Sequence, residues 1–357
     1  MKVAIVYDRV NKWGGAERVL LALHEMFPEA PLYTSVYSPC GATWAKVFPD
    51  VVTSFLQRVP FAKKHHELLP VFMPTAFEWF DFSVYDLVIS VTSEAAKGII
   101  TMPSTKHICY LLTPTRYLWS HNEHYFKNKL FSIITRPLVG YLKSWDYMAA
   151  QRPDLIISIS KAVQARTEKY YGRKSEIIYP PVEIVRKDGK TTPHAKDYFL
   201  VLGRLVAYKK VDLVVKTFNK LGLPLVIVGT GREEKKLKQL AKSNVLFTGF
   251  VKEEDLGKYY RGAKALIFPQ EEDFGLTSVE AQSYGVPVIA YKKGGSLDTV
   301  CDLQTGIFFE EQTIESLMKA IEKFNDMKFD VKMITKNAEK FSKERFKKEF
   351  LKIVQKV

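Results

Sequence analysis

Short runs of consecutive apolar residues alternate along the chain with longer segments in which apolar residues recur every three or four positions. The first run is Lys2–Tyr7, and a loop rich in glycine and polar residues, Asp8–Gly15, follows it. Ala16–Met26 then carries its apolar residues at the spacing of one helix face. A strand, a glycine-rich loop and a helix in this order are typical of the first unit of a doubly wound α/β fold.

The same alternation continues along the chain and predicts parallel sheets. The further runs that we predict as strands are Leu87–Val91, His107–Leu112, Leu155–Ser158, Tyr198–Leu202, Leu225–Val228, Val245–Thr248, Ala265–Phe268 and Pro287–Ala290. Unbroken apolar runs are expected where a parallel sheet is buried on both faces. The tail, Lys332–Val357, predicts a basic amphipathic helix or a pair of helices.

The length of the chain predicts two domains. Its 357 residues are too many for one ordinary core. Tyr179–Pro193 contains two adjacent prolines and a charged KDGK segment, which indicates an interdomain linker. We therefore expect an α/β protein with two Rossmann-like, doubly wound domains facing across a cleft. Ligands of such sheets bind at the carboxyl ends of the strands, and clefts between domains are common sites.

The net charge of +14 indicates an anionic partner. The partner could be a nucleotide diphosphate, an anionic membrane surface or a nucleic acid. A basic surface exposed to solvent, with no anionic partner, would also explain the charge. The three cysteines are scattered and odd in number, which favours a reducing cytoplasm over a disulfide framework. The start of the chain lacks the pattern of a signal peptide, and no apolar run approaches the roughly 18–20 residues of a membrane span. We therefore expect a cytoplasmic protein or one at the inner face of the membrane.

The segment Phe268–Gly295 carries the most specific chemical signal. Glu272 and Glu280 are separated by seven residues, with a Phe-Gly-Leu core between them. The candidate ligand-binding residues here are Glu272, Phe274, Gly275, Leu276, Thr277 and Glu280. The amides of Gly275–Thr277 lie at a predicted helix start, where free amides and the helix dipole suit a diphosphate. Carboxylates suit the diols of a sugar or a ribose, because each has two acceptor oxygens. A buried strand followed by a capped helix would explain the apolar residues but not both glutamates.

Two cations follow the strand that ends at Gly203. Arg204 and Lys209 would lie at the sheet edge, where they could stabilise negative charge on a leaving diphosphate. A pair of solvated surface cations is the alternative. Weaker signals are glycine turns after predicted strands or before the first helix: Gly229 and Gly231, the segment Gly249, Phe250 and Val251, and Gly14 and Gly15. Each of these is also compatible with an ordinary turn.

These segments together resemble the family 4 glycosyltransferases, which have the GT-B fold. The matching patterns are E-x7-E with the FGL core, then EA-x3-G-x-PVIA, and the earlier G-R-L-x3-K. The segments WGGAERVL and YGRKSEIIYPPVE are similar to the O-antigen mannosyltransferase branch. The resemblance assigns Glu272 to the donor hexose, Glu280 to the ribose, and Arg204 and Lys209 to the phosphates. It also places the nucleotide on Gly229 and Gly231, the base on the backbone of Gly249–Val251, and the glycine loop of Gly14 and Gly15 near donor or acceptor.

The sequence departs from the family pattern at two positions. Lys210 occupies a position that is usually glycine, and Leu112 stands where a histidine often touches the donor sugar. Arg116, in the same segment, is our candidate substitute for that histidine.

The resemblance implies a retaining, metal-independent transfer of a hexose in cell-surface polysaccharide synthesis. Mannose from GDP-mannose is the expected donor, and a saccharide or a lipid-linked saccharide is the expected acceptor. No cofactor, metal or nucleic acid is expected. The implied domains are an acceptor-binding domain at 1–185, a nucleotide-sugar-binding domain at 195–340, and a helix at 341–357 that packs back on the first domain. A nucleotide-sugar epimerase of the same fold is an alternative. A nucleic-acid-binding protein is a second one, but it leaves Glu272 and Glu280 unexplained.

Two further patterns are less specific. His121 and His124 have the spacing of a helical metal pair, but no third ligand is evident, so a surface pair is favoured. Phe55–Phe82 and Tyr125–Trp145 mix basic and aromatic residues. That mixture suits a membrane interface, single-stranded nucleic acid, or core aromatics with solvated lysines.

Overall fold

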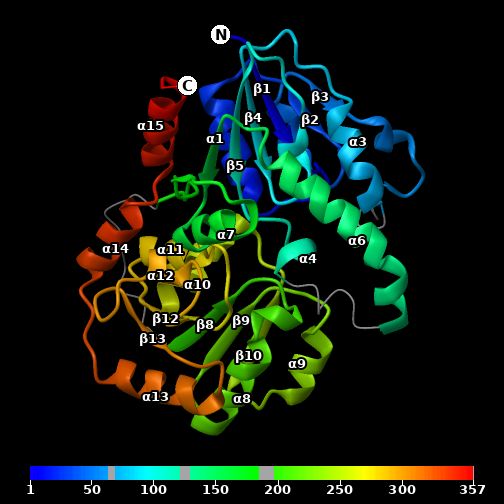
Figure 1. Cartoon of the computed structure of the whole chain (residues 1–357). Helices are drawn as coiled ribbons and strands as arrows, with labels where there is room; N and C mark the ends of the chain where they lie inside the picture. Colours follow the sequence, from blue (N-terminus) through cyan, green and yellow to red (C-terminus); the bar gives the residue numbers. More distant parts are fainter. Residues whose placement is uncertain (63–68, 121–128, 185–196, 357) are drawn as a thin grey trace. The chain divides into compact units, whose positions relative to one another are not determined.

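The computed structural model describes residues 1–62, 69–120, 129–184 and 197–356. Within them the chain forms two compact units (Figure 1). Unit 1 is Met1–Pro181 with Phe346–Val357, and unit 2 is Val182–Arg345. The boundary after Pro181 lies inside the predicted linker, whose residues from 185 onward are outside the described part of the chain.

Unit 1 is built on a seven-stranded parallel sheet with the order β3-β2-β1-β4-β5-β6-β7. Its strands are β1 (Val3–Tyr7), β2 (Leu32–Thr34), β3 (Val51–Thr53), β4 (Leu87–Thr92), β5 (Lys106–Leu111), β6 (Leu155–Ser158) and β7 (Glu176–Ile177). Its helices are α1 (Gly15–Met26), α3 (Met73–Glu78), α4 (Arg116–Trp119), α6 (Lys129–Ala149), α7 (Lys161–Tyr171) and α15 (Lys343–Val354), with 3-10 turns at Thr43–Val47, Phe55–Arg58, Pro70–Phe72 and Ala96–Gly98. β1 and β4 are buried along their whole length, as their unbroken apolar sequences require.

The last helix, α15, packs on the sheet of unit 1. Its residues Phe346 and Phe350 are fully buried, and their ring centroids lie 5.7 and 6.4 Å from that of Tyr110 on β5. Tyr110 also donates a hydrogen bond from its hydroxyl to the carbonyl oxygen of Ile178 at 2.9 Å. The aromatic contacts therefore fix the end of the chain to residues more than 230 positions earlier.

Unit 2 has a six-stranded parallel sheet with the order β10-β9-β8-β11-β12-β13. The strands are β8 (Tyr198–Leu202), β9 (Leu225–Val228), β10 (Val245–Gly249), β11 (Ala263–Phe268), β12 (Val288–Tyr291) and β13 (Gly306–Phe309). The helices are α8 (Val211–Leu221), α9 (Glu234–Leu240), α10 (Leu256–Gly262), α11 (Leu276–Ser283), α12 (Ser296–Thr299), α13 (Ile314–Asn325) and α14 (Val331–Glu339), with 3-10 turns at Ala207–Lys209 and Glu253–Asp255.

Two separate cores cover the two faces of this second sheet. Phe199 on β8 belongs to the core that contains Phe218 of α8 and Phe324 of α13. Leu200, the next residue, belongs to the core that contains Tyr260 of α10 and Ala281 of α11. Neighbouring residues of a strand point to opposite faces, so a strand covered on both sides must be apolar throughout.

The strand order shows where each sheet reverses direction of winding. In unit 1 the chain moves outward from β1 to β3 and then returns to place β4 beside β1. In unit 2 it moves from β8 to β10 and then returns to place β11 beside β8. Both units are therefore doubly wound, which confirms the predicted fold class. In such folds ligands bind at the carboxyl ends of the two strands that flank the reversal.

The sequence missed β2, β3, β7 and β13, whereas every strand that it predicted is present within two residues at each end. The predicted basic tail is the helix pair α14 and α15.

Candidate functional site

The two predicted cations and the predicted residues around Glu272 lie at the carboxyl ends of β8 and β11, where the strand order reverses. Gly203 and Arg204 follow β8 directly, and Lys209 closes the 3-10 turn Ala207–Lys209. Glu272 lies in the loop between β11 and α11. The two loops lie close together, because Lys209 Nζ forms an ion pair with Glu272 Oε1. Two residues 63 positions apart are thus brought together at the point that the topology marks as a ligand site.

The Glu272 side chain is held on one side and partly exposed. Its Oε1 also accepts a hydrogen bond from Gln270 Nε2 at 3.3 Å. The side chains of Lys209 and Glu272 are 16 % and 21 % exposed, so both remain in reach of a ligand.

Gly294 and Gly295 fix the backbone of that loop. The amide of Gly295 donates to the carbonyl oxygen of Glu272 at 2.8 Å. A Cβ atom on Gly294 would lie 2.4 Å from the same oxygen, and one on Gly295 would lie 2.3 Å from Phe274 Cα. Only glycine allows such an approach. These two residues are therefore part of the site, although the sequence had not singled them out.

The helix α11 begins at the site with Gly275 as its N-cap. Gly275 has a φ of +90°, and no side chain caps the helix. Leu276 and Thr277 form the first turn and are partly buried. Their amides belong to the group of donors that an α-helix leaves without intrahelical partners, which suits an anion. Phe274 contributes only its backbone, because its side chain is 3 % exposed and its ring packs 5.5 Å from that of Phe341.

The glycine turns after β8, β9 and β10 lie against one another. A Cβ atom on Gly229 would lie 2.0 Å from the carbonyl oxygen of Gly203, and one on Gly231 would lie 2.2 Å from that of Leu205. The amide of Gly229 donates to the carbonyl oxygen of Gly249 at 2.9 Å. The structure thus brings these predicted glycines together. The lack of a side chain at Gly229 and Gly231 serves backbone packing, whereas a Cβ atom on Gly203 or Gly249 would meet nothing within 4 Å.

The remaining predicted residues of unit 2 differ in their surroundings. Phe250 is 77 % exposed, and Val251 packs against the second core. Arg204 is exposed, and its side chain makes no hydrogen bond or ion pair within the described ranges. Glu280, one turn into α11, accepts a hydrogen bond at Oε2 from the hydroxyl of Tyr260 at 2.7 Å.

In unit 1, Gly14 is the N-cap of α1 and Gly15 its first residue, and both are exposed. Arg116 begins α4, and Leu112 is partly buried directly after β5. These positions lie at the carboxyl edge of the first sheet, in the loops after β1 and β5. His121 and His124 lie outside the described residues.

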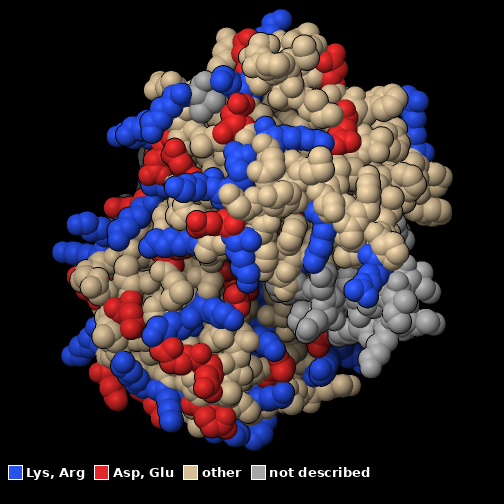
Figure 2. All heavy atoms as spheres, viewed as in Figure 1, with Lys and Arg blue, Asp and Glu red and all other residues tan. Residues whose placement is uncertain are grey.

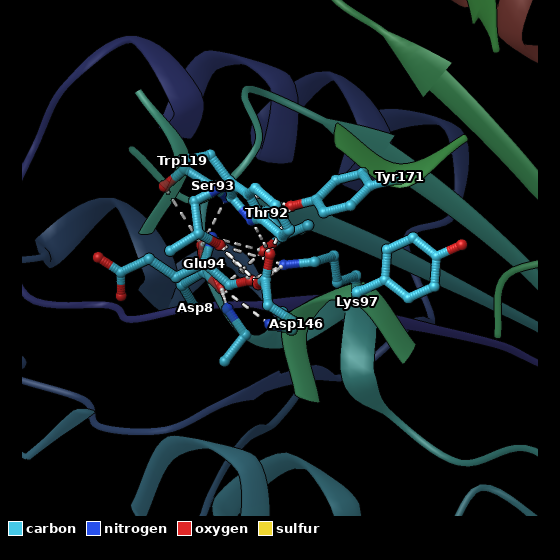
Figure 3. Close-up of polar contacts among 12 residues, drawn as sticks. Asp8, Thr92, Ser93, Glu94, Lys97, Trp119, Asp146 and Tyr171 are labelled. Carbon is cyan, nitrogen blue, oxygen red and sulfur yellow. Dashed lines mark hydrogen bonds and ion pairs between the residues drawn. The ribbon is translucent and has the colours of Figure 1, made fainter. Parts of the chain in front are cut away.

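A buried carboxylate that the sequence reasoning missed organises the reversal point of unit 1 (Figure 3). Asp8 follows β1 and is 1 % exposed. It accepts from Thr92 Oγ1 and from the four consecutive amides of residues 93–96, at distances between 2.7 and 3.1 Å. This bonding fixes the loop after β4. Its neighbour Arg9 forms an ion pair with Glu94 at 2.5 Å.

A second buried carboxylate, Asp146 of α6, joins three more elements (Figure 3). It accepts from Lys97 Nζ at 2.5 Å, and from Thr115 Oγ1, Trp119 Nε1 and the Tyr171 hydroxyl at 2.7 Å each. Burial and this carboxylate raise the pKa of Tyr171 well above its usual value. The network ties α4, and with it Arg116, to the body of the unit.

Neither a metal centre nor a membrane span is found in the described part of the chain. No group of three or more His, Cys, Asp or Glu side chains there could hold a metal ion. No helix among those residues combines the length and the apolar character needed to cross a bilayer.

Two family models match the chain in succession. The model "Glycosyltransferase Family 4" matches residues 13–186, and "Glycosyl transferases group 1" matches residues 185–341. Their junction lies within five residues of the boundary between the two units.

Curated relatives match parts of the chain. An O-antigen chain mannosyltransferase C of Escherichia coli is 26 % identical over 212 residues, covering 55 % of this chain and 53 % of that protein. A glycogen synthase of Thermodesulfovibrio yellowstonii is 37 % identical over 134 residues, covering 34 % and 27 %. The chain thus matches about half, or less, of the length of these relatives.

Solved structures match over the whole chain at low identity. The apo form of the lipopolysaccharide outer core galactosyltransferase WaaB has a TM-score of 0.70 at 18 % identity, with all of both chains covered. HepE of Anabaena, in complex with UDP-glucose, has a TM-score of 0.71 at 18 % identity, also with all of both chains covered. These similarities confirm the GT-B fold.

Proposed function

Because the chain belongs to the family 4 glycosyltransferases of the GT-B fold, we propose that it is a retaining, metal-independent hexosyltransferase of cell-surface polysaccharide synthesis. The observation that carries this proposal is the Lys209–Glu272 ion pair at the reversal point of the second sheet, directly before the uncapped start of α11. A cation, a carboxylate and free helix amides are the groups that a nucleotide-diphosphate sugar requires at one place.

The proposed chemistry follows from these groups. The bond between the anomeric carbon and the diphosphate oxygen breaks, and the acceptor oxygen bonds to the same face of the sugar. The acceptor proton passes to the departing phosphate oxygen. Lys209 and Arg204, with the first amides of α11, stabilise the charge that grows on the diphosphate. Glu272 accepts hydrogen bonds from the sugar hydroxyls and orients the reacting carbon. Metal is not needed in this scheme, because the cations and the helix start take over its electrostatic role.

The variant Glu272→Gln tests the site. Glutamine keeps the shape and one acceptor oxygen but loses the charge and the partner of Lys209. We expect transfer to fall at least about 100-fold, the scale of losing one positioned electrostatic group, with the melting temperature close to that of the wild type. Glu271→Gln is the control, since Glu271 is an exposed neighbour. Wild-type turnover in Glu272→Gln would refute the site.

The stereochemistry and the metal requirement are tested directly. Anomeric NMR of the product should show the configuration of the donor, and an inverted linkage would refute front-face departure. Activity should be unchanged by EDTA. Incubation with donor alone should give no isomerised sugar nucleotide; its appearance would favour an epimerase instead.

For the donor, we propose GDP-mannose. Similarity to the E. coli O-antigen mannosyltransferase supports this choice. HepE is a structural neighbour solved with UDP-glucose, and WaaB is a galactosyltransferase. A thermal-shift screen with GDP-, UDP- and ADP-sugars therefore decides the donor, because a bound ligand raises the apparent stability by mass action. Stabilisation by a UDP-sugar alone would refute the mannose assignment.

We propose a saccharide or lipid-linked acceptor, reached by contact of unit 1 with the cytoplasmic face of an anionic membrane. The exposed residues of α6 support this: Tyr141, Tyr147 and Met148 are 53 %, 46 % and 62 % exposed, and Arg136 of the same helix is also exposed. Trp79, at the end of α3, is 78 % exposed, and the surface over α3 is largely uncharged in Figure 2. Aromatic and basic residues together suit the bilayer interface.

Vesicle binding tests this contact. Co-sedimentation with anionic vesicles should exceed that with neutral vesicles, and Trp79→Ser with Tyr141→Ser should reduce it. On the face shown in Figure 2, lysine and arginine are interspersed with aspartate and glutamate, which does not favour a nucleic acid. Equal sedimentation with both vesicle types would refute the anionic membrane contact.

A further inference from the structure

Tyr260 is a buried tyrosine whose hydroxyl meets the carboxylate that the proposed function assigns to the ribose. It lies on α10, is 2 % exposed, and its hydroxyl donates to Glu280 Oε2 at 2.7 Å. Glu280 lies on α11 and is only partly buried. The bond therefore connects the core of unit 2 to a side chain at the edge of the candidate site.

The Tyr260 ring is held on both sides. It belongs to the core that also contains Leu266 and Ala281, and its other neighbour is Tyr284, whose ring is stacked at a centroid distance of 5.1 Å and an angle of 16°. Arg261 lies over the Tyr284 ring at 5.2 Å from its centroid. A ring fixed in this way has no alternative position for its hydroxyl, so the donor is preorganised.

Gly257 leaves the space that this stack needs. A Cβ atom on Gly257 would lie 2.9 Å from the Tyr284 hydroxyl and 3.3 Å from an Arg261 guanidinium nitrogen. Gly257 is buried in the first turn of α10, where a larger residue would push Tyr284 away from Tyr260. The arrangement of α10 against α11 thus depends on one small residue and two stacked rings.

A glutamate that binds a diol needs a hydrogen bond that fixes the orientation of its carboxylate. Its side chain has several rotatable bonds, and ordering them on ligand binding costs free energy. One hydrogen bond from a fixed tyrosine settles the orientation of the carboxylate before the ligand arrives. The carboxylate has room for about four hydrogen bonds, so the bond from Tyr260 leaves capacity for ribose hydroxyls.

We propose that Tyr260 is a positioning residue that orients Glu280 toward the ribose of the sugar nucleotide. The inference rests on the proposed function, because it takes Glu280 as the ribose carboxylate. It adds a residue to the recognition of the nucleotide that lies outside the sequence motif of the site, and it predicts that the effect of Tyr260 acts only through the ribose hydroxyls.

The test measures nucleotide binding by calorimetry with and without the ribose hydroxyls. The probes are GDP, UDP and ADP, followed by the 2′,3′-dideoxy form of whichever binds most tightly. We expect Tyr260→Phe to bind the ribonucleotide about 10-fold more weakly than the wild type, equivalent to about 1.4 kcal/mol. Its affinity for the dideoxy form should stay within about twofold of the wild type, by the same relation.

Tyr198→Phe is the matched control. The Tyr198 hydroxyl donates to the carbonyl oxygen of Tyr259 at 2.9 Å, so this variant also removes one hydroxyl bonded to α10, without touching Glu280. It should bind both nucleotides as the wild type does. Glu280→Gln should reproduce the selective loss, and the double variant with Tyr260→Phe should be little weaker than Glu280→Gln alone, because the two residues act as one unit.

The outcomes separate the two proposals. If the wild type prefers the ribonucleotide but Tyr260→Phe binds it equally well, or loses both forms equally, the positioning role is refuted and the proposed function stands. If the wild type binds none of the three diphosphates, or does not distinguish ribose from dideoxyribose, the assignment of Glu280 fails and the role of Tyr260 fails with it.

Discussion

Replacing Lys97 by methionine should leave a buried carboxylate in unit 1 without its cation. Lys97 Nζ lies 2.5 Å from Asp146 Oδ1, and the two side chains are 1 % and 2 % exposed. Methionine keeps the length of the side chain and suits the buried surroundings, so the change in packing is small. Removing one partner of a buried ion pair typically costs about 3–5 kcal/mol, because the other charge stays buried.

The contacts of Asp146 place the expected cost at the lower end of that range. Three neutral donors, from Thr115, Trp119 and Tyr171, remain on the carboxylate after Lys97 is removed. We therefore expect a loss of about 3 kcal/mol in the free energy of unfolding of unit 1. At roughly 2–4 °C per kcal/mol for a domain of 150–250 residues, the melting temperature should fall by about 6–12 °C.

Differential scanning calorimetry measures this shift, with Lys106→Met as the control. Lys106 is exposed at the start of β5, and its replacement should change stability by no more than about 0.5 kcal/mol. The double variant of Lys97→Met with Asp146→Asn should lose less than the sum of the single variants, because asparagine removes the stranded charge. A loss below about 1 kcal/mol for Lys97→Met would show that the ion pair does not stabilise unit 1.

Three other perturbations test separate parts of the structure. Gly231→Ala places a methyl group 2.2 Å from the carbonyl oxygen of Leu205 and should destabilise unit 2 in urea titrations. The control is Gly140→Ala in α6, where a Cβ atom meets nothing within 4 Å; it should be neutral or stabilising by up to about 1 kcal/mol. Equal effects of the two changes would contradict the close approach of Gly231 to Leu205. Lys209→Ala should lower kcat about 10²–10³-fold. The control, Lys210→Gly, should keep kcat and slightly raise stability, because the φ of Lys210 is +53°. Equal losses of kcat in the two variants would refute the role of Lys209. Burial lowers the pKa of His107 to about 3, so below about pH 6.5 the unfolded chain binds a proton at this residue and the folded chain does not. The free energy of unfolding should therefore fall by about 2 kcal/mol from pH 7 to pH 5 through this group. A His107→Gln variant with the same dependence of stability on pH would contradict this.

The sequence predicted the architecture because buried parallel strands leave a strong local signal. Runs such as Leu225–Val228 are apolar at every position, and the structure covers them on both faces. Three of the four missed strands carry a weaker signal: β2 and β3 have three residues each and β7 has two. Segments of that length gain their strand geometry from pairing with a neighbour, which no local pattern records.

The candidate site of unit 2 was predictable to the extent that its residues follow strand ends. Glu272 and Lys209 each lie in a loop directly after a strand, so the topology alone brings them to one edge. Gly294 and Tyr260 were not predictable in this way. Gly294 acts through contact with a backbone 22 residues earlier, and Tyr260 acts from the interior of a helix that bears no recognisable motif.

The buried polar network of unit 1 was invisible to the sequence for a different reason. Asp8 binds amides 85 to 88 positions further along the chain, and Asp146 binds donors between 25 and 49 positions away. From the sequence alone, a carboxylate directly after a strand is interpreted as a loop residue or as a ligand-binding residue. Only the fold shows that its acceptors are already satisfied by the protein.

The two reversal points therefore differ in what fills them. In unit 1, a carboxylate at the end of β1 accepts the amides that follow β4, so the protein supplies its own anion. In unit 2, the corresponding strand β8 ends at a glycine, and the helix after β11 begins without a side-chain cap. Amides that a protein carboxylate has taken cannot bind a phosphate as well. The same edge of the same kind of sheet is thus occupied by a protein carboxylate in unit 1 and lacks a side-chain cap in unit 2. This difference supports the proposal that the diphosphate binds in unit 2.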